Sequence, residues 1–462
     1  MRFAIIHSVD PSAVERRAIA HLSELLLPIG GDYPICIKEN ETIPEGYTKI
    51  FLGTRESNSA VRRRSSEPLT HAEEYRIEVK NGEITVEGYD FGGVLYGAID
   101  LYNRYLLPMK YVNAVTESYS RFDEPLSDFS LTSHPSVRER GIWTWGHVIY
   151  DYRGFIDNMV KLKMNSIIIW NDHIPFNMSE IIDYAHSSAV SVILGYSWGW
   201  DQRCKELSLS SLDNKSGEIF EKFEREYKDL PIDGIYFQTI TELEEEYIEG
   251  VLVADAVTDF VNKTAALFYE KYPDLLIEFG LHATSVKNRL DFITKVDKRL
   301  RIVWEDFGAM PFAYNATDIR NFEETKELCV KCSTLRGECD NFGVVTKSVC
   351  CLDWKAFVHP SGPQNIGVST KALKQSRMKR KERVLRSATA GWILNGDKAL
   401  ETVSALVSAK GGDFSANALV EDGVFGERIP YSVALFAEIL WRCCDSYPDI
   451  VKTVSLLDYV EF

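Results

Sequence analysis

The feature that most constrains the fold is a repeat of apolar segments that begins at Val137. Each segment ends in polar residues and is followed by a helical pattern. Segments that are apolar on both faces are typical of strands buried between a barrel interior and a ring of helices. The sequence contains eight such segments, at 141–145, 165–170, 190–198, 232–242, 275–283, 301–306, 342–354 and 391–396. Eight strand–helix units in about 270 residues predict an α/β fold of the (β/α)₈ or TIM barrel type.

An open, doubly wound sheet is the weaker alternative, because no phosphate-binding glycine pattern follows any predicted strand. A chain of 462 residues is long enough for two domains. Residues 1–125 predict a small α/β domain, in which two alternating apolar runs around Asn81-Gly82 indicate a β-hairpin. We expect residues 111–135 to link this domain to a catalytic barrel at 137–462 that ends in helices.

The composition and net charge of the chain exclude several classes of binding partner. The net charge of −16 argues against nucleic acid and anionic membranes, because both need a basic surface. We find neither the apolar core of a signal peptide nor an 18-residue apolar window that could cross a membrane. Nine cysteines, with two adjacent pairs, indicate reduced thiols rather than a disulfide framework. The expected location is therefore the cytoplasm, and the oligomeric state is not predictable.

Aromatic residues gather where the active site of such a barrel is expected. All nine tryptophans follow residue 142, and seven lie in or just past the carboxyl-terminal half of a predicted strand. Active sites of (β/α)₈ barrels lie at these strand ends. Sugar rings stack on aromatic side chains while carboxylates and amides bind the hydroxyl groups. The sequence therefore predicts a carbohydrate site whose binding residues include Trp145, Trp198, Trp200, Trp304 and Trp354. The alternative is that these tryptophans only pack strands against helices.

Cleavage of a glycosidic bond needs a protonated acid and either a second carboxylate or the substrate's own acetamido group. Glu242 ends the fourth predicted strand, and partial burial there would raise its pKa, so it is the leading general acid. It could instead merely begin the solvated acidic run 242–249. The candidates for the second carboxylate are Glu305 and Asp306 after the sixth strand, with Asp172 and Glu278 behind them.

Four segments resemble glycoside hydrolases that carry a small α/β domain before a catalytic barrel, a group that includes β-N-acetylhexosaminidases and α-glucuronidases. These segments are EYRIEVKNGEITVEGYDFGGVLYGAIDLYNRYL (74–106), RERGIWTW (138–145), FIDNMVKLKMNSIIIWND (155–172) and CLDW (351–354). The resemblance implies that Arg140 holds the hydroxyl groups of the terminal sugar. It also implies that Asp353 binds the sugar and that Asp172 is the acid after the second strand.

The chain departs from the hexosaminidases at one position. They place an Asp-Glu pair after the fourth strand, whereas this sequence has Thr241-Glu242. A threonine could bind the acetamide by a hydrogen bond but could not stabilise a developing oxazolinium charge. The sequence predicts a glycosidase that removes a terminal hexosaminide or uronide from a glycan, without a cofactor or a metal. A carbohydrate-binding protein that has lost catalysis is the alternative, and the missing aspartate supports it.

Three further signals are weaker. A metal-dependent isomerase or aldolase on the same barrel lacks a clear ligand set, and Lys347 is the only interior lysine that could form a Schiff base. Cys329, Cys332 and Cys339 have a spacing that zinc sites also use, but the first two fall within a helical pattern. The basic run 371–387 is most simply a solvated helix face. It could instead border the substrate cleft and meet an acidic sugar.

Overall fold

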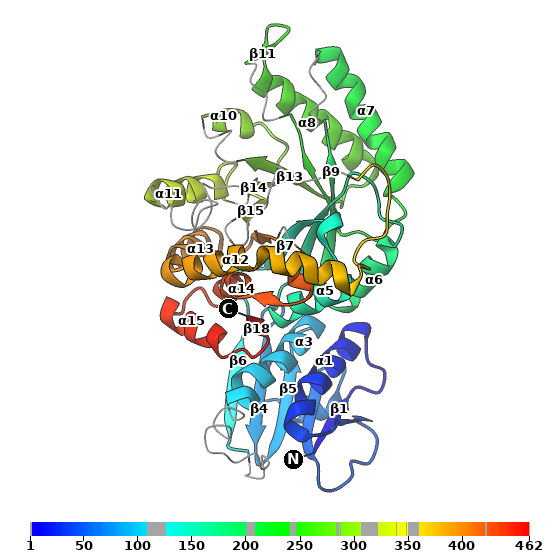
Figure 1. The fold of residues 1–462 in the computed structure, drawn as a ribbon, viewed down its shortest axis with the longest axis vertical. Helices are drawn as coiled ribbons and strands as arrows, with labels where there is room; N and C mark the ends of the chain where they lie inside the picture. Colours follow the sequence, from blue (N-terminus) through cyan, green and yellow to red (C-terminus); the bar gives the residue numbers. More distant parts are fainter. Residues whose placement is uncertain are drawn as a thin grey trace.

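A closed barrel of eight parallel strands and a separate six-stranded sheet make up the computed structural model (Figure 1). The structure describes residues 2–108, 126–199, 208–240, 246–282, 286, 288–305, 322–338, 340–347, 349, 360–420 and 423–461, without the side chains of 378, 380, 381 and 424. The predicted (β/α)₈ barrel with a small α/β domain before it is confirmed. No helix in these ranges is long and apolar enough to cross a membrane.

The amino-terminal domain is built on a mixed sheet in the order β2-β1-β3-β5-β4-β6. Its strands are β1 (Phe3–His7), β2 (Ile35–Lys38), β3 (Thr48–Thr54), β4 (Tyr75–Lys80), β5 (Glu83–Gly88) and β6 (Phe129–Ser133). Its helices are α1 (Ala13–Gly30), α2 (Ser59–Arg64) and α3 (Phe91–Asp100), which continues as the π-helix η1 (Leu101–Leu106). The predicted hairpin is present, because β4 pairs antiparallel with β5 and both Asn81 and Gly82 have positive φ, as a type I′ turn requires.

The predicted linker 111–135 is wrong in one part. Residues 129–133 form β6, which pairs antiparallel with β4 and completes the sheet. Strand β6 lies at the edge of the sheet and its residues are only half-buried or exposed. An edge strand without a fully buried face need not alternate apolar and polar residues, so β6 could not be predicted from the sequence.

The barrel strands run in the order of the chain and close on themselves. They are β7 (Glu139–Trp145), β8 (Ser166–Trp170), β9 (Ser191–Ser197), β10 (Gly234–Gln238), β13 (Leu276–His282), β14 (Arg301–Glu305), β15 (Phe342–Thr346) and β16 (Ser415–Leu419). Six of the eight predicted segments contain a barrel strand, and 141–145 lies within β7. The eighth prediction, 391–396, is wrong, because these residues end helix α12 (Lys371–Asn395) and the last strand is β16. The sequence of β16, SANAL, is built of small residues and gave no apolar run.

The helices surround the barrel as a ring in Figure 1. They are α5 (Tyr152–Lys161), α6 (Met178–Ser187), α7 (Leu209–Glu226), α8 (Val253–Lys271), α10 (Leu290–Ile293), α11 (Phe322–Ser333), α12, α13 (Asp397–Lys410), α14 (Tyr431–Trp441) and α15 (Tyr447–Ser455). Short elements complete the fold: η2 (Gly146–Val148), β11 (Tyr247–Ile248), β12 (Val251–Leu252), η4 (Val424–Gly426), β17 (Ile429–Pro430) and β18 (Val460–Glu461). The amino-terminal domain packs beside α5, α6 and α14.

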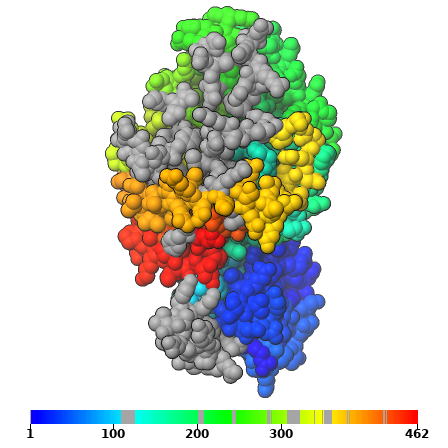
Figure 2. Space-filling model, in the orientation of Figure 1, coloured from blue at the N-terminus to red at the C-terminus, as the bar shows by residue number. Residues whose placement is uncertain are grey.

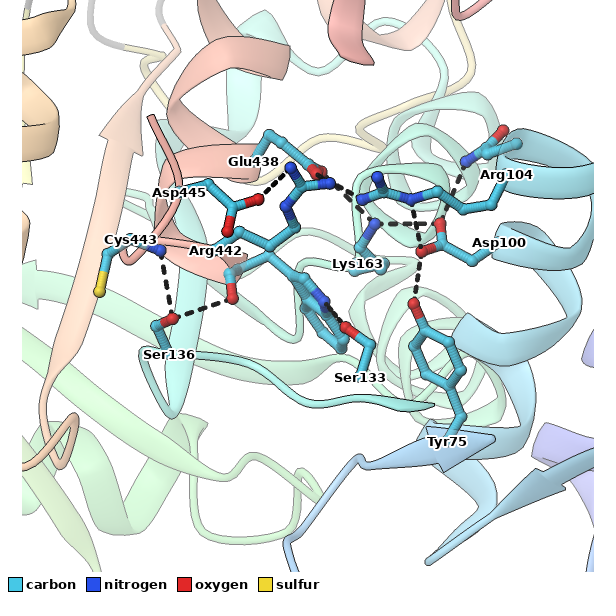
Figure 3. Close-up of polar contacts among 12 residues, drawn as sticks. Tyr75, Asp100, Arg104, Ser133, Ser136, Lys163, Glu438, Arg442, Cys443 and Asp445 are labelled. Atoms are coloured by element: carbon cyan, nitrogen blue, oxygen red, sulfur yellow. Dashed lines mark hydrogen bonds and ion pairs between the residues drawn. The ribbon is translucent and has the colours of Figure 1, made fainter. Parts of the chain in front are cut away.

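A buried charged network joins the two domains (Figure 3). The ammonium of Lys163, in the turn after α5, lies 3.1 Å from Asp100 of α3 and 3.5 Å from Glu438 of α14. Arg104 bridges the same two carboxylates, at 3.5 Å from Asp100 and 2.7 Å from Glu438. Burial alone would raise the pKa of Asp100 and Glu438, but Lys163 and Arg104 outweigh it and lower both pKa values. The network therefore fixes the domain to the barrel through ionised, buried groups.

A second buried cluster lies at the amino-terminal end of the barrel interior. Arg301 donates to Glu278 at 2.8 Å and also binds Glu139. The oxygen Oε2 of Glu278 has no hydrogen-bond partner, and burial, opposed by Arg301, raises the pKa of Glu278 to about 7. Glu278 is therefore a structural acid at the barrel floor rather than a second catalytic carboxylate.

This raised pKa has a measurable consequence for stability. Between its unfolded pKa of about 4.5 and its folded pKa of about 7, Glu278 holds a proton in the native state that the unfolded chain has lost. The free energy of unfolding should therefore fall as the pH rises through this window. Glu278→Gln mimics the protonated acid and should flatten that part of the profile, which denaturant titrations from pH 5 to pH 8 would measure. An unchanged slope would contradict the assignment.

Candidate active site at the barrel mouth

A layer of mostly apolar side chains fills the middle of the barrel and forms the bottom of the site. It consists of inward-facing side chains, namely Trp143, Ile168, Ile193, Tyr236, Val303, Val345 and Leu419. Side chains alternate between the two faces of a strand. On each strand, the residue two positions after a member of this layer therefore also faces inward, one layer nearer the carboxyl-terminal end. Those residues include Trp145, Trp170, Gln238 and Glu305. The site is built from this upper layer.

Glu305, the last residue of β14, is the centre of a cluster of polar groups from neighbouring strands, which we call the Glu305 cluster. Its Oε1 accepts hydrogen bonds from the hydroxyl of Tyr236 and from Nε2 of Gln238, the latter at 2.5 Å. Its Oε2 lies 3.3 Å from Nζ of Lys347 and 3.6 Å from Nε2 of His282. The Lys347 ammonium is also 3.4 Å from Nδ1 of His282. Both carboxylate oxygens are thus oriented by donors.

A glycine on the next strand makes this arrangement possible. Gly280 of β13 faces the barrel interior between Tyr236 and Glu305. A Cβ atom at this position would overlap the hydroxyl oxygen of Tyr236 and lie 2.8 Å from Oε1 of Glu305. Any larger residue would therefore displace the hydroxyl that orients the carboxylate.

The electrostatics of the cluster keep Glu305 ionised. Its side chain is only 6% exposed, and burial alone would raise its pKa. The charges of Lys347 and His282, with the hydrogen bonds from Tyr236 and Gln238, outweigh that effect and lower the pKa of Glu305. Burial and the adjacent carboxylate raise the pKa of Tyr236 well above its usual range, so its hydroxyl remains a donor. Glu305 is therefore suited to act as a base, a nucleophile or a stabiliser of positive charge, and not as the general acid.

Aromatic residues connect this cluster to a hollow in the barrel mouth. The rings of Trp143 and Trp145 are 4.6 Å apart in an edge-to-face arrangement, and the ring of Trp170 lies 6.2 Å from Tyr236. The hollow encloses about 320 Å³, part of it open to solvent. It is lined by Trp145, His147, Trp170, Asn171, Asp172, His173, Pro175, Pro360, Gly362 and Gln364.

The structure brings together three of the residues predicted for the site. Trp145 and Asp172 line the hollow, and Glu305 lies at the centre of its polar cluster. Glu242, Asp306, Trp200, Asp353 and Trp354 are outside the described residues and stay predictions. Tyr236, Gln238 and Gly280 also belong to the site and were not predicted from the sequence. Their positions could have been inferred from alternation, since 236 and 238 share the parity of Glu242 on the predicted fourth strand.

Two of the predicted sugar-binding tryptophans are misassigned. Trp198 is fully buried and stacks on Phe237 at 3.7 Å and on Phe268 of α8 at 5.3 Å. Trp304 precedes Glu305 and so faces the opposite side of β14, in the core between strands and helices. Both therefore pack the barrel against its helical ring, as the alternative interpretation of the tryptophans proposed.

The predicted role of Arg140 is also wrong. Arg140 lies near the start of β7, at the end of the barrel opposite Glu305, and is only 1% exposed. Its guanidinium donates to the backbone oxygens of Lys163 and Val137 and lies 2.6 Å from Glu73 of the amino-terminal domain. Its contacts hold the domains together, and a sugar at the barrel mouth is out of its reach.

The zinc-like spacing of the cysteines does not correspond to a metal site in the described part of the chain. Cys329 and Cys332 are buried in α11, and burial raises the pKa of Cys332 to about 12. Cys339 is outside the described residues. Among the residues that the structure describes, no three or more His, Cys, Asp or Glu side chains form a group that could hold a metal ion.

Comparison with known proteins places this barrel among glycoside hydrolases by fold. No protein-family model and no curated protein matches the sequence. A family GH115 4-O-methyl-α-glucuronidase with specificity for decorated arabinogalactans superposes with a TM-score of 0.54 and 14% identity, over 95% of this chain. A chitobiase from Flavobacterium johnsoniae gives 0.55 and 12%, over 98% of this chain and 68% of its own. A β-N-acetylhexosaminidase from Bacteroides fragilis gives 0.51 and 15%, over 95% and 86%.

The chain has the fold of these glycoside hydrolases. It spans 56% of the length of the GH115 enzyme. At identities of 12–15% these comparisons show a shared fold, and the resemblance of the sequence segments is confirmed at that level.

Proposed function

We propose that this protein is a glycoside hydrolase that removes a terminal sugar, a hexosaminide or a uronide, from a glycan. The observation that carries the proposal is the ionised carboxylate of Glu305, buried in the barrel mouth beside an aromatic-lined hollow. Glycosidic cleavage needs such a carboxylate to attack the sugar carbon, to activate water or to stabilise the oxocarbenium-like transition state. The other requirement is a protonated acid for the leaving oxygen, and the sequence assigns that role to Glu242.

The roles of the two acids follow from the difference in their surroundings. Cationic and hydrogen-bonding neighbours hold Glu305 as the charged form, which a proton donor cannot be. Tyr236 and Gln238 orient one oxygen, and Lys347 orients the other. Glu242 follows Gln238 by four residues in the sequence, so the proposed acid comes from the loop after β10. The hollow would hold the terminal sugar against Trp145 and Trp170.

The first test addresses Glu242. Glu242→Gln should lower kcat about 10²–10⁴-fold on an aryl glycoside with a poor leaving group, because the leaving oxygen is no longer protonated. The loss should be much smaller on a dinitrophenyl glycoside, whose leaving group needs no proton. Steady-state kinetics on both substrates would measure the difference, and calorimetry would show that the sugar product still binds.

Glu246→Gln is the matched control, because Glu246 lies in the same acidic run and its side chain is 63% exposed. It should leave kcat within about twofold. Equal losses in both variants, or a loss at Glu242 that ignores the leaving group, would refute the acid role.

A carbohydrate-binding protein without catalysis is the second candidate, and one observation favours it. Both oxygens of Glu305 already accept from protein groups, and Thr241 replaces the aspartate of the hexosaminidases. A wild-type protein that binds sugars but cleaves no member of a broad aryl glycoside panel would establish this function. The Schiff-base alternative is weaker, because Schiff-base formation needs a neutral amine and Lys347 forms an ion pair with Glu305 at 3.3 Å.

A further inference from the structure

The first half of helix α12 is exposed to an unusual degree. Between residues 371 and 383 every described side chain is exposed except Lys374, which is half-buried. The second half packs normally, with Leu385 and Trp392 buried against the body of the protein. In Figures 1 and 2 the helix crosses the front of the molecule, and its yellow and orange surface is open in the space-filling view. The first half of α12 is therefore a free surface and not part of the core.

Loops at the carboxyl-terminal ends of the barrel strands fix this segment. Nζ of Lys374 lies 2.9 Å from Asp151, in the loop after β7, and 2.7 Å from Glu427, in the loop after β16. Val368 forms a β-bridge with Asp151. Thr370 caps the helix by accepting from the backbone N–H of Leu373. The exposed half of α12 thus borders the same end of the barrel as the hollow.

The exposed surface carries unpaired positive charge. Lys371, Arg377, Lys379 and Arg383 are exposed, and within the described part of the chain none of them forms an ion pair. Glu382 is the only acid in 371–387, and it pairs with Arg386. A solvated helix face is ordinarily stabilised by acids four residues from the bases, whereas Lys379 and Arg383 are like charges at that spacing. The like-charged pair at that spacing is unfavourable by about 0.2–0.5 kcal/mol, and an anionic ligand would relieve this repulsion.

The hollow and the basic half of α12 are joined by one short stretch of chain. Pro360, Gly362 and Gln364 line the hollow, and α12 begins seven residues after Gln364. From Lys371 to Arg383 the helix rises about 18 Å, which is longer than one sugar ring. A glycan whose terminal sugar fills the hollow could therefore continue along these cations.

We propose that Lys371, Arg377, Lys379 and Arg383 bind the anionic units of an acidic polysaccharide whose terminal sugar enters the hollow. This inference rests on the proposed glycosidase function and names the substrate class. Nucleic acid fits less well, because the segment 371–383 has no aromatic residue on which a base could stack. The acidic units would carry carboxylate or sulfate groups. Both anions accept charge-assisted hydrogen bonds from guanidinium and ammonium groups.

The test compares two variants of the full-length protein by affinity electrophoresis. One changes Lys371, Arg377, Lys379 and Arg383 to Gln. The matched control changes four exposed cations elsewhere, namely Arg62, Lys228, Lys298 and Lys452, to Gln. Polygalacturonate is the carboxylated probe, chondroitin sulfate the sulfated probe and dextran the neutral one. A single-stranded oligo-dT of comparable charge tests for nucleic acid.

We expect the wild type to bind at least one acidic polysaccharide and not dextran, more weakly as the salt concentration rises. The α12 variant should bind at least tenfold more weakly, and the control variant should stay within about twofold of wild type. Equal losses in the two variants, binding of oligo-dT as tight as that of the polysaccharides, or no binding of either acidic probe would overturn the proposal.

Hydrolysis of a small aryl glycoside separates this proposal from the proposed function. Both variants should keep the wild-type kcat/KM on that substrate, because it does not reach α12. Wild-type hydrolysis without polyanion binding would refute the inference alone. Polyanion binding through α12 without hydrolysis of any glycoside would refute the glycosidase function and support the binding surface.

Discussion

Glu305→Gln is expected to lower kcat of glycoside hydrolysis about 10²–10⁴-fold, with a much smaller effect on sugar binding. The amide keeps the shape of the side chain but removes the negative charge that would assist the reacting carbon. Because its neighbours lower the pKa of Glu305, any hydrolysis by the wild-type protein should also persist below the ordinary pH range of a glutamate. Steady-state kinetics from pH 3 to pH 8 would measure both effects.

A structural role must be separated from a catalytic one in this experiment. Glutamine at 305 leaves Lys347 and His282 without their carboxylate, so some loss of stability is expected. Glu278→Gln is the matched control, because Glu278 is a buried barrel carboxylate on the neighbouring strand but lies at the opposite end. It should leave kcat nearly unchanged. If the two variants lost activity equally, or if Glu305→Gln lost it only through unfolding, Glu305 would not be a catalytic residue.

The barrel could be predicted from sequence because its strands are buried on both faces and so appear as apolar runs. The same property hides which residues face inward. Trp143 and Trp145 alternate toward the barrel interior, whereas Trp198 and Trp304 alternate toward the helices, and the two kinds of position look alike in an apolar run. The tryptophans that face the barrel interior could therefore be identified only in part.

Position along a strand was more informative than residue type. Glu305 ends its strand and lies in the site, as expected for a barrel. Arg140 precedes most of its strand and lies at the other end, although the family resemblance suggested a sugar contact. Alternation along the fourth strand indicates that Tyr236 and Gln238 share a face, but their hydrogen bonds to Glu305 could not be predicted. The donors come from β10, β13 and the end of β15, and only the closed barrel brings these together.

The second large effect concerns the stability of the domain junction. Lys163→Met should lower the free energy of unfolding by about 3 kcal/mol, because it removes one of the two cations that the buried carboxylates share and leaves Arg104 as the other. Lys163 is only 4% exposed, and its ammonium contacts both Asp100 and Glu438. Methionine retains most of the apolar volume of the lysine side chain, so the loss of stability can be attributed to removal of the positive charge. Denaturant unfolding at pH 7 would measure it, followed by tryptophan fluorescence and by circular dichroism.

The pH dependence and a double variant test the same assignment. The depressed pKa values of Asp100 and Glu438 contribute stability above their unfolded values of about 4, and this contribution disappears as the pH falls through and below that range. The difference between wild type and Lys163→Met should therefore shrink in acid. Adding Glu438→Gln to Lys163→Met should cost less than the sum of the two single changes, because both changes remove the same Lys163–Glu438 ion pair. Strict additivity, or a difference that does not change with pH, would show that Lys163 acts through packing and not through its charge.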